Sequence, residues 1–199
     1  MKPKEILVFG ATGNIGRNII RKLTKNNYKV VAVTRNIHQK GFQLKTQANP
    51  GYLELVELER LDEAKIKDLF NSCSVCINLI GILYEKNKGQ FNKIHSVLPN
   101  ILSKIAKEKK IDQFIHVSAL GVENASNSVY AKSKLDGENN VKKNFKNSLI
   151  LKPSIVYGID DNFTTNFMSL LSKLPIMPLY YNGETKFVPI HVSDLAEII

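Results

Sequence analysis

The sequence predicts an α/β fold in which a doubly wound parallel sheet carries helices on both faces. The first observation is that short apolar runs alternate with stretches whose apolar residues recur at helical spacing. The second is a glycine-rich turn that joins the first apolar run to the first helical pattern. The third is size, because 199 residues with 43% hydrophobic content can bury a full core. These observations indicate a chain built around one parallel sheet.

The elements follow one another in a regular order. We expect strands at residues 6–9, 29–33, 53–58, 75–80, 114–117 and 149–156, and helices near residues 15–25, 63–71, 91–109 and 129–145. Residues 36–50 are polar, and we expect a mobile loop there. After residue 158 the pattern changes to a helix at 160–173, a turn bracketed by Pro175 and Pro178, a strand at 186–192 and a helix beginning at Ser193. Because that last helix has few residues in which to run, we expect the chain to continue.

The glycine-rich turn has the spacing of a dinucleotide-binding loop. Gly10, Gly13 and Gly16 follow a buried strand and open a helix. Gly10 allows the tight turn, Gly13 lets the backbone approach a pyrophosphate, and Gly16 lets the helix pack against the sheet. The free N–H groups at the start of the helix then face the phosphates. We therefore expect a Rossmann-type dinucleotide-binding domain over residues 1–158, followed at 159–199 by the start of a C-terminal substrate region that is incomplete.

The end of the second strand indicates which dinucleotide is bound. An NAD-binding chain would place an acidic residue there for the ribose 2′-hydroxyl, but the sequence has Val33, Thr34 and Arg35. Arg17 follows the third glycine, in the first turn of its helix, where a cation opposes the helix dipole unless an anion is near. A guanidinium group suits a phosphate. The sequence therefore predicts that NADP(H) is preferred and NAD(H) is possible, although both arginines could be ordinary solvated charges.

The net charge of +10 does not point to nucleic acid. The lysines are spread along the chain, and no block of five or six like charges occurs. Two small groups of lysines are best interpreted as solvated helix faces. The alternative is that they bind an acidic partner. These groups are Lys107, Lys109 and Lys110, and Lys142, Lys143 and Lys146.

The two cysteines, Cys73 and Cys76, have a CxxC spacing. In a strand, residues three apart point to opposite faces, so we expect a reduced pair rather than a disulfide. No apolar run approaches the about 18 residues that span a bilayer, and the N-terminus lacks the apolar core of a signal peptide. We expect a cytoplasmic protein without a transmembrane segment and without a metal site.

Three side chains could carry hydride-transfer chemistry. Tyr130 and Lys134 lie one helical turn apart, and Ser118 follows a strand whose carboxyl end faces the same crevice. Tyr130 would exchange a proton with the substrate oxygen, Lys134 would favour the phenolate and reach the ribose hydroxyls, and Ser118 would bond the substrate oxygen. The alternative is a surface tyrosine and lysine on a helix. A second such pair, Tyr84 and Lys88, lies in a charged loop without a serine partner.

These motifs together resemble the short-chain dehydrogenase/reductase superfamily, on its extended or atypical side. The segments GATGNIGR, NLIG, HVSALG, YAKSK and LKPSIVYG stand in that family's order over nearly the whole chain. More narrowly, SALG, YAKSK followed by GE, PSIVYG, DDNF and FVPIHVSDLAE resemble the nucleotide-binding accessory subunit of respiratory complex I and its bacterial relatives. The resemblance implies a doubly wound sheet, a bound NADP(H) and, in the mitochondrial members, a mainly structural role.

The resemblance also implies residue roles. The pyrophosphate would lie on Gly10, Thr12, Gly13, Asn14, Ile15 and Gly16, the 2′-phosphate on Arg17 and Arg35, the adenosine ribose on Leu79, Ile80 and Gly81, and the nicotinamide on Pro153, Ile155 and Val156, near Tyr130 and Lys134. The chain departs from the family in three places. Only Glu59 is available where an aspartate meets the adenine, Lys152 replaces an arginine, and His95 replaces the asparagine of many sugar-nucleotide epimerases. His95 could equally be a packed helix residue.

Two functions remain open at this point. The first is an NADP(H)-binding protein attached to a respiratory NADH:quinone oxidoreductase, peripheral at the inner face of its membrane. The second is a soluble NAD(P)-dependent reductase or nucleotide-sugar epimerase or dehydratase that uses Ser118, Tyr130 and Lys134. A redox-sensing regulator is a third, weaker alternative. A homodimer through the helices near 91–109 and 129–145 is expected by analogy only.

Overall fold

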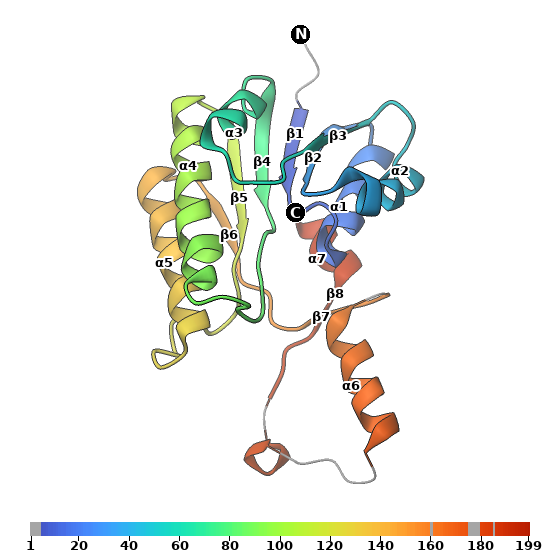
Figure 1. The fold of residues 1–199 in the computed structure, drawn as a ribbon, viewed down its shortest axis with the longest axis vertical. Coiled ribbons are helices and arrows are strands. Elements are labelled where there is room, and N and C mark those ends of the chain that lie inside the picture. Colours follow the sequence, from blue (N-terminus) through green and yellow to red (C-terminus); the bar gives the residue numbers. More distant parts are fainter. Residues whose placement is uncertain (1–4, 160, 175–179, 185) are drawn as a thin grey trace.

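The computed structural model describes residues 5–159, 161–174, 180–184 and 186–199, and its centre is a six-stranded parallel sheet. The strands lie in the order β3-β2-β1-β4-β5-β6, which confirms the predicted doubly wound fold (Figure 1). Their bounds are β1 Glu5–Phe9, β2 Lys29–Thr34, β3 Leu53–Glu57, β4 Cys73–Asn78, β5 Gln113–Val117 and β6 Leu149–Leu151. The order reverses between β1 and β4, so a crevice opens at the carboxyl ends of these two strands.

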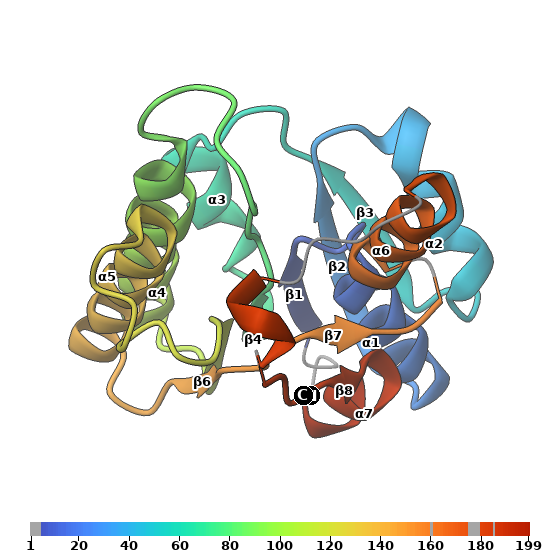
Figure 2. The same cartoon turned by 90° about the horizontal axis from the view of Figure 1, so that it is seen from below.

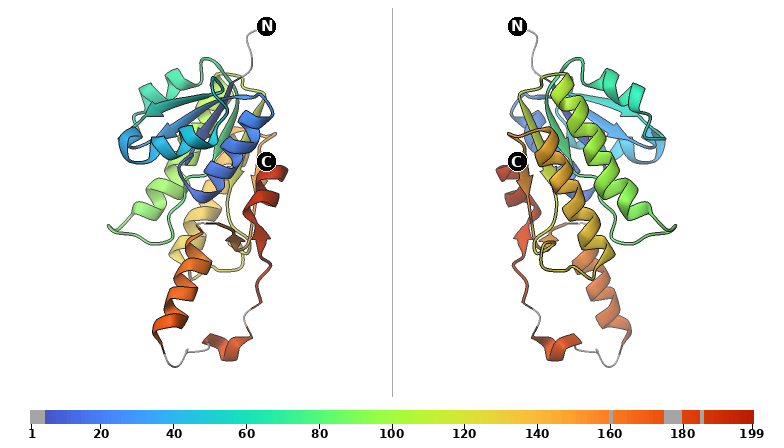
Figure 3. Two further views of the ribbon diagram at one scale, coloured as in Figure 1. Left: turned by 90° about the vertical axis from the view of Figure 1, so that its right-hand side faces the viewer. Right: turned by 90° about the vertical axis from the view of Figure 1, so that its left-hand side faces the viewer.

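Helices cover both faces of the sheet, as the end-on and side views show (Figures 2 and 3). On one face lie α1 (Asn14–Lys25), α2 (Phe42–Gln47) and α7 (Val192–Ile198). On the other face lie α3 (Glu63–Leu69), α4 (Leu98–Glu108) and α5 (Val129–Asn144). Each layer buries its own apolar cluster, with Ile19, Ile20 and Leu44 on the first face and Ile66, Leu102 and Val141 on the second. Burial of both faces explains why the strands are continuous apolar runs.

Several expected elements differ in the structure. The loop expected at residues 36–50 contains a π-helical turn, η1 (Ile37–Gly41), followed by α2. The helix expected near 91–109 begins with another π-helical turn, η2 (Asn92–Val97), that runs into α4. The strand expected at 149–156 divides into β6 and β7 (Val156–Tyr157), because Pro153 has no N–H for a sheet ladder.

The last part of the chain leaves the sheet and then returns to it. Helix α6 (Asn162–Lys173) extends away from the carboxyl edge of the sheet, and Asp161 caps its first turn (Figure 1). The strand expected at 186–192 shortens to β8 (Ile190–His191), which pairs in parallel with β7. A short 3₁₀ turn, η3 (Tyr180–Gly183), lies between them in the sequence. The predicted turn at Pro175 and Pro178 lies outside the described residues.

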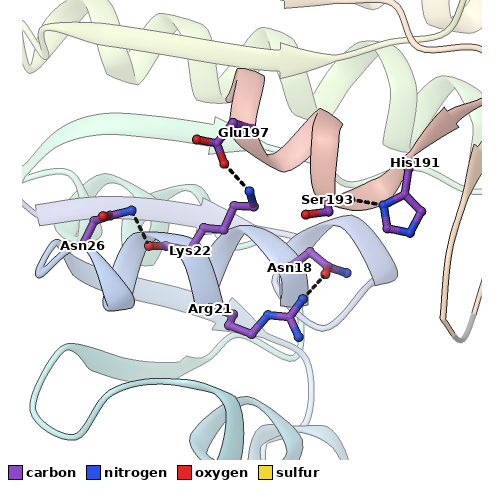
Figure 4. Close-up of polar contacts among 7 residues, drawn as sticks. All are labelled: Asn18, Arg21, Lys22, Asn26, His191, Ser193 and Glu197. Carbon is purple, nitrogen blue, oxygen red and sulfur yellow. Dashed lines mark hydrogen bonds and ion pairs between the residues drawn. The ribbon is translucent and has the colours of Figure 1, made fainter.

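Helix α7 packs against α1, and Ala196 shares an apolar cluster with Ile19 and Ile20. Polar side chains of both helices lie nearby (Figure 4). The side chain of His191 caps α7 by accepting from the backbone N–H of Ser193. An ion pair joins Lys22 of α1 to Glu197 of α7. The segment 192–198 therefore packs against the domain that contains the six-stranded sheet. The domain boundary predicted at residue 158 stays a prediction.

The two cysteines correct one argument from the sequence. Cys73 and Cys76 are free thiols, but they face the same apolar cluster rather than opposite faces. The reason is a bulge in β4, because Glu5 pairs with Cys73 while Ile6 pairs with Val75. Burial raises the pKa of the Cys73 thiol to about 12 and raises that of Cys76 as well. Both are therefore unreactive core residues at neutral pH.

Helix α5 crosses η2 at a glycine, and this close approach can be tested. A Cβ on Gly137 would lie 1.8 Å from the carbonyl oxygen of His95. We expect Gly137→Ala to lower the free energy of unfolding by about 1–3 kcal/mol, the usual cost of overpacking. In an exposed helix the same change stabilises by about 1 kcal/mol. Urea unfolding of Gly137→Ala measures whether the variant is less or more stable than the wild type, with Asn139→Ala, an exposed change on α5, as the control. A Gly137→Ala variant that is more stable than the wild type would contradict the close packing of α5 on η2.

Candidate functional site

The turn between β1 and α1 lies against the turn that follows β4. Gly10 has a φ of +82°, and a Cβ placed on it would lie 3.0 Å from the backbone N of Ile80 and the carbonyl carbon of Leu79. A Cβ on Gly16 would lie 2.5 Å from the carbonyl oxygen of Gly10. Only glycine fits either position without moving the backbone. The predicted roles of Gly10 in the turn and of Gly16 in packing α1 therefore agree with the structure.

The first turn of α1 presents its backbone to this crevice. Gly13 is the N-cap residue, makes no side-chain cap, and no acidic residue lies in the first turn. The N–H groups at the start of a helix and the positive end of its dipole form a site for an anion. Gly13 itself is exposed, and Thr12 is half-buried beside it. This arrangement suits the pyrophosphate that the sequence predicts at this turn.

A cavity of about 280 Å³ begins at this turn. It runs along the carboxyl ends of β1, β2 and β4, with apolar walls from Val33, Leu58 and Leu79. Its lining brings together many of the predicted cofactor residues. These are Gly10, Thr12, Gly13, Arg35, Leu79, Ile80 and Gly81. An apolar slot with a few polar groups is the usual form of a site for a nucleoside.

Two cations flank one end of this cavity. Arg35 follows β2, as predicted, and Lys40 comes from the π-helical turn η1, which the sequence does not reveal. Both side chains are exposed, so they can turn toward a bound anion. The signal that could have located Lys40 is a helical turn directly after β2. Both groups suit a phosphate at this end of the cavity.

Other predicted residues lie away from this cavity. Arg17 lines a separate cavity of about 130 Å³ with Arg21 and His191. Glu59 is exposed and does not line the cavity, although its neighbour Leu58 does. Asn14 faces the smaller cavity with Arg17, and Ile15 packs against the α1-side core. The 2′-phosphate role predicted for Arg17 and the adenine role predicted for Glu59 stay predictions.

The three predicted catalytic residues lie beyond Gly81. Ser118 follows β5 and is buried, and its Oγ has no hydrogen-bond partner among the described residues. The ammonium group of Lys134 donates to the carbonyl oxygen of Val117 at 3.4 Å and lies 3.2 Å from where a Cβ on Gly81 would stand. Tyr130, half-buried one turn earlier on α5, packs edge-on against His95 and Phe91. Gly81, which lines the cavity, therefore lies next to the ammonium group of Lys134.

Segment 153–156 crosses from β6 to β7 and is fixed by two backbone bonds. The carbonyl oxygen of Pro153 accepts from the N–H of Leu120 at 2.9 Å, and that of Ile155 accepts from Ile190 at 2.9 Å. Pro153, Ile155 and Val156 are half-buried and do not line the cavity. Their predicted contact with the nicotinamide stays a prediction.

His95 is a packed and fully bonded histidine. Its Nε2 accepts from the backbone N–H of Ile82 at 3.0 Å, so Nδ1 carries the proton and donates to Ser133 Oγ at 3.0 Å. Ser133 Oγ in turn donates to the carbonyl oxygen of Tyr130 at 2.7 Å. Burial and the charge of Lys134 lower the pKa of His95 to about 4. Neutral His95 therefore fixes the loop after β4 and the start of α5.

A second buried histidine was missed by the sequence interpretation. His116 lies on β5, two residues before Ser118, and its Nδ1 lies 3.2 Å from Asn78 Nδ2. Its Nε2 has no hydrogen-bond partner among the described residues. Burial, Lys134 and His95 lower its pKa to about 3. The only feature of the sequence that could have indicated a buried histidine here is the position of His116 near the end of a strand.

The protonation of Tyr130 differs from the expectation. Lys134 was expected to favour the phenolate, but burial raises the pKa of Tyr130 above its ordinary value. Burial also lowers the pKa of Lys134 to about 8, against the opposing charge of Glu138. In the unliganded protein, desolvation therefore outweighs the attraction between the two groups.

Comparison with known proteins identifies relatives of two kinds. The sequence profile of the NmrA-like family matches residues 2–186. NADH dehydrogenase (ubiquinone) 1 alpha subcomplex subunit 9 of Arabidopsis thaliana is 31% identical over 193 residues, which cover 96% of this chain and 48% of that protein. The mouse protein of the same name is 28% identical over 96% of this chain and 50% of its own length. The predicted resemblance to the complex I accessory subunit is confirmed.

Another relative has the name of an enzyme. Ceramide reductase of Caulobacter vibrioides is 26% identical over 96% of this chain and 58% of that protein. The chain spans about half the length of the complex I relatives that it matches.

Solved structures confirm the fold. The Bordetella bronchiseptica enzyme WbmH in complex with NAD+ superposes with a TM-score of 0.77 at 18% identity, over 98% of this chain and 70% of that one. UDP-glucuronic acid 4-epimerase of Bacillus cereus, in complex with UDP-glucuronic acid and NAD, superposes with a TM-score of 0.76 at 22% identity. The match covers 96% of this chain and 70% of that one. In the described part of this chain, no helix has the length and apolar character needed to cross a membrane.

The neutral histidines make stability depend on pH. Unfolded histidine has a pKa near 6.5, whereas folded His95 has one of about 4, so the unfolded chain binds the extra proton first as pH falls. The contribution of neutral His95 is complete above pH 6.5 and is lost as pH falls toward 4. By this linkage we expect it to fall by about 2 kcal/mol between pH 6.5 and 5. Urea unfolding at several pH values measures the slope.

The matched control is His38, which is exposed on η1. We expect His95→Gln to reduce the slope of stability with pH, with buried His116 supplying the slope that remains, and His38→Gln to leave the wild-type slope unchanged. Equal slopes in the two variants would show that His95 is not held neutral.

Proposed function

The chain belongs to the NmrA-like family, and on that premise we propose that it is an NADP(H)-binding, short-chain dehydrogenase/reductase-like protein that associates with a respiratory NADH:quinone oxidoreductase. The observation that carries the cofactor proposal is the cavity between the β1–α1 turn and Gly81, with Arg35 and Lys40 at one end. The partner proposal draws on the mitochondrial relatives, whose names place them in NADH dehydrogenase. It would act peripherally, at the inner face of a respiratory membrane.

The site holds the dinucleotide in the following way. The amides of the Gly10–Gly16 turn would hold the pyrophosphate, the apolar slot would take the adenosine, and Arg35 and Lys40, which both line the cavity, would bind a 2′-phosphate. Lys134, whose ammonium group lies beside Gly81, would bind the nicotinamide ribose. NAD(H) would bind in the same place without the contacts to the 2′-phosphate. A ligand that binds only the folded protein stabilises it by about 4 kcal/mol at a thousandfold excess over Kd.

The second candidate function is catalysis by Ser118, Tyr130 and Lys134 in an NAD(P)-dependent reductase or a nucleotide-sugar epimerase or dehydratase. Two observations favour it: the buried Ser118 Oγ has no partner among the described residues, and one relative is named ceramide reductase. A phenol whose pKa is raised by burial serves as the proton donor in the direction of carbonyl reduction. A homodimer through α4 and α5 stays a prediction, and nucleic acid is not among the proposed partners.

Cofactor preference can be tested at Arg35. We expect Arg35→Ala to weaken NADPH binding about 10–100-fold, the loss of one or two charge-assisted hydrogen bonds, and to change NADH binding little. Calorimetric titration with both dinucleotides measures the ratio. Lys25→Ala, an exposed change at the end of α1, is the matched control. Equal losses for NADPH and NADH would remove the assignment of Arg35 to the 2′-phosphate.

Tyr130 separates the two functions. For the subunit proposal, we expect the natural full-length protein to co-fractionate with the respiratory oxidoreductase, and Tyr130→Phe to leave the activity of that assembly unchanged. The enzyme proposal predicts instead a free protein that consumes NADPH with a carbonyl substrate and loses at least about 100-fold in rate in Tyr130→Phe. Membrane fractionation with NADPH-oxidation assays on both forms distinguishes the outcomes.

A further inference from the structure

Glu138 is a completely buried carboxylate next to the candidate site. It lies on α5, one turn after Lys134, and its side chain is 0% exposed. Lys152 Nζ lies 3.0 Å from its Oε2, and Lys142 Nζ lies 3.9 Å away. No backbone amide or hydroxyl group of the described residues donates to either oxygen. The charge is therefore balanced by lysines rather than by hydrogen bonds.

Such a carboxylate is costly to retain unless its partners stay in place. A buried charge left without its counter-ion destabilises a protein strongly, whereas replacing both charges together costs little. Lys152 is 30% exposed and makes a second contact, with Glu123 at 3.3 Å. These carboxylates, Glu138 first, raise the pKa of Lys152, so it is fully charged at neutral pH. The ion pair ties α5 to the segment after β6.

Lys152 directly precedes segment 153–156. That segment is held on its other side by the bonds from Leu120 to Pro153 and from Ile190 to Ile155. On the side of α5, the residue before the segment is joined to that helix by the ion pair of Lys152 with Glu138. The pair therefore links α5, which carries Tyr130 and Lys134, to the start of the segment predicted to meet the nicotinamide.

Glu138 also lies one helical turn after Lys134, on the same face of α5. The titratable groups around Lys134 are Tyr130 and Glu138 on α5, His95 on η2 and His116 on β5. Both histidines are neutral and Tyr130 is protonated, so none of these three supplies a negative charge. Glu138 is the group that favours the charged form of Lys134, against the burial that disfavours it.

We infer that Glu138 is a positioning residue of the cofactor site, which anchors segment 153–156 through Lys152 and keeps Lys134 in its ammonium form beside Gly81. Charges then alternate from the surface inward, from Lys152 to Glu138 to Lys134. The inference rests on the proposed role of Lys134 toward the dinucleotide, but the charge of Lys134 can be measured without any ligand.

The direct test follows the titration of Lys134 in the cofactor-free protein. In protein carrying ¹³C-labelled lysine, with the Lys134 signal assigned by its loss in Lys134→Met, we expect a midpoint near pH 8. Glu138→Gln should lower this midpoint by at least about one pH unit, because an opposite charge nearby favours the ammonium form. Glu123→Gln, which removes the exposed partner of Lys152, should leave it unchanged. An unchanged midpoint in Glu138→Gln would overturn the inference.

Variants of Lys152 test the anchoring. Lys152→Arg should retain the ion pair and the wild-type NADPH affinity, whereas Lys152→Met should weaken NADPH binding at least about tenfold. If Glu138→Gln does not fold, the double change Glu138→Gln with Lys152→Met removes both charges and should fold. Its Lys134 midpoint should be lowered in the same way, and an unchanged midpoint there overturns the inference.

The outcome is separable from the proposed function. Wild-type protein that binds no NADP(H) would contradict the cofactor proposal, while a Glu138-dependent Lys134 midpoint in the same protein would still support the charge relation. Folded Glu138→Gln could instead keep both the Lys134 midpoint and the NADPH affinity of the wild type. That result would contradict the positioning role of Glu138 and leave the cofactor proposal intact.

Discussion

The structure depends on the close approach of two backbone turns at the point where the strand order reverses. Gly10 packs against the backbone of Leu79 and Ile80, and Gly16 lets α1 pack against the backbone of Gly10 and Ala11. Side chains at these positions would separate β1 from β4 and move the start of α1. Because the helix is held so near the sheet, its uncapped amides face the crevice rather than solvent alone. Fold and candidate site therefore share one constraint.

A second constraint is the buried polar layer between the sheet and α5. Asn78, His95, His116, Lys134 and Glu138 are all less than 6% exposed, yet they lie in the middle of an apolar face. Hydrogen bonds satisfy His95, while an ion pair compensates Glu138. Among the residues that the structure describes, His116 Nε2 on β5 and Ser118 Oγ directly after that strand have no hydrogen-bond partner. A protein retains such groups at a cost in stability, which is typical of a site that a ligand completes.

Much of this could be predicted from the sequence, because local rules govern it. Strand and helix periods located β1 to β5, α1 and α3 to α5, although not α2, and the glycine spacing located the turn. The errors arose where distant contacts decide. The bulge in β4 turned Cys73 to the face of Cys76, η1 brought Lys40 to the cavity, and desolvation reversed the expected pKa direction of Tyr130. The pairing of Glu138 with Lys152 was equally hidden, because it joins two elements that only the fold brings together.

The central claim is that the main chain of the Gly10–Gly16 turn holds the diphosphate of an adenine dinucleotide. The most direct measurement is a crystal structure of the natural full-length protein soaked with NADPH, supported by calorimetric titration of the same material. The account predicts density for the diphosphate at the first turn of α1 and for the 2′-phosphate between Arg35 and Lys40. An empty turn at saturating NADPH, with no heat of binding, would contradict it.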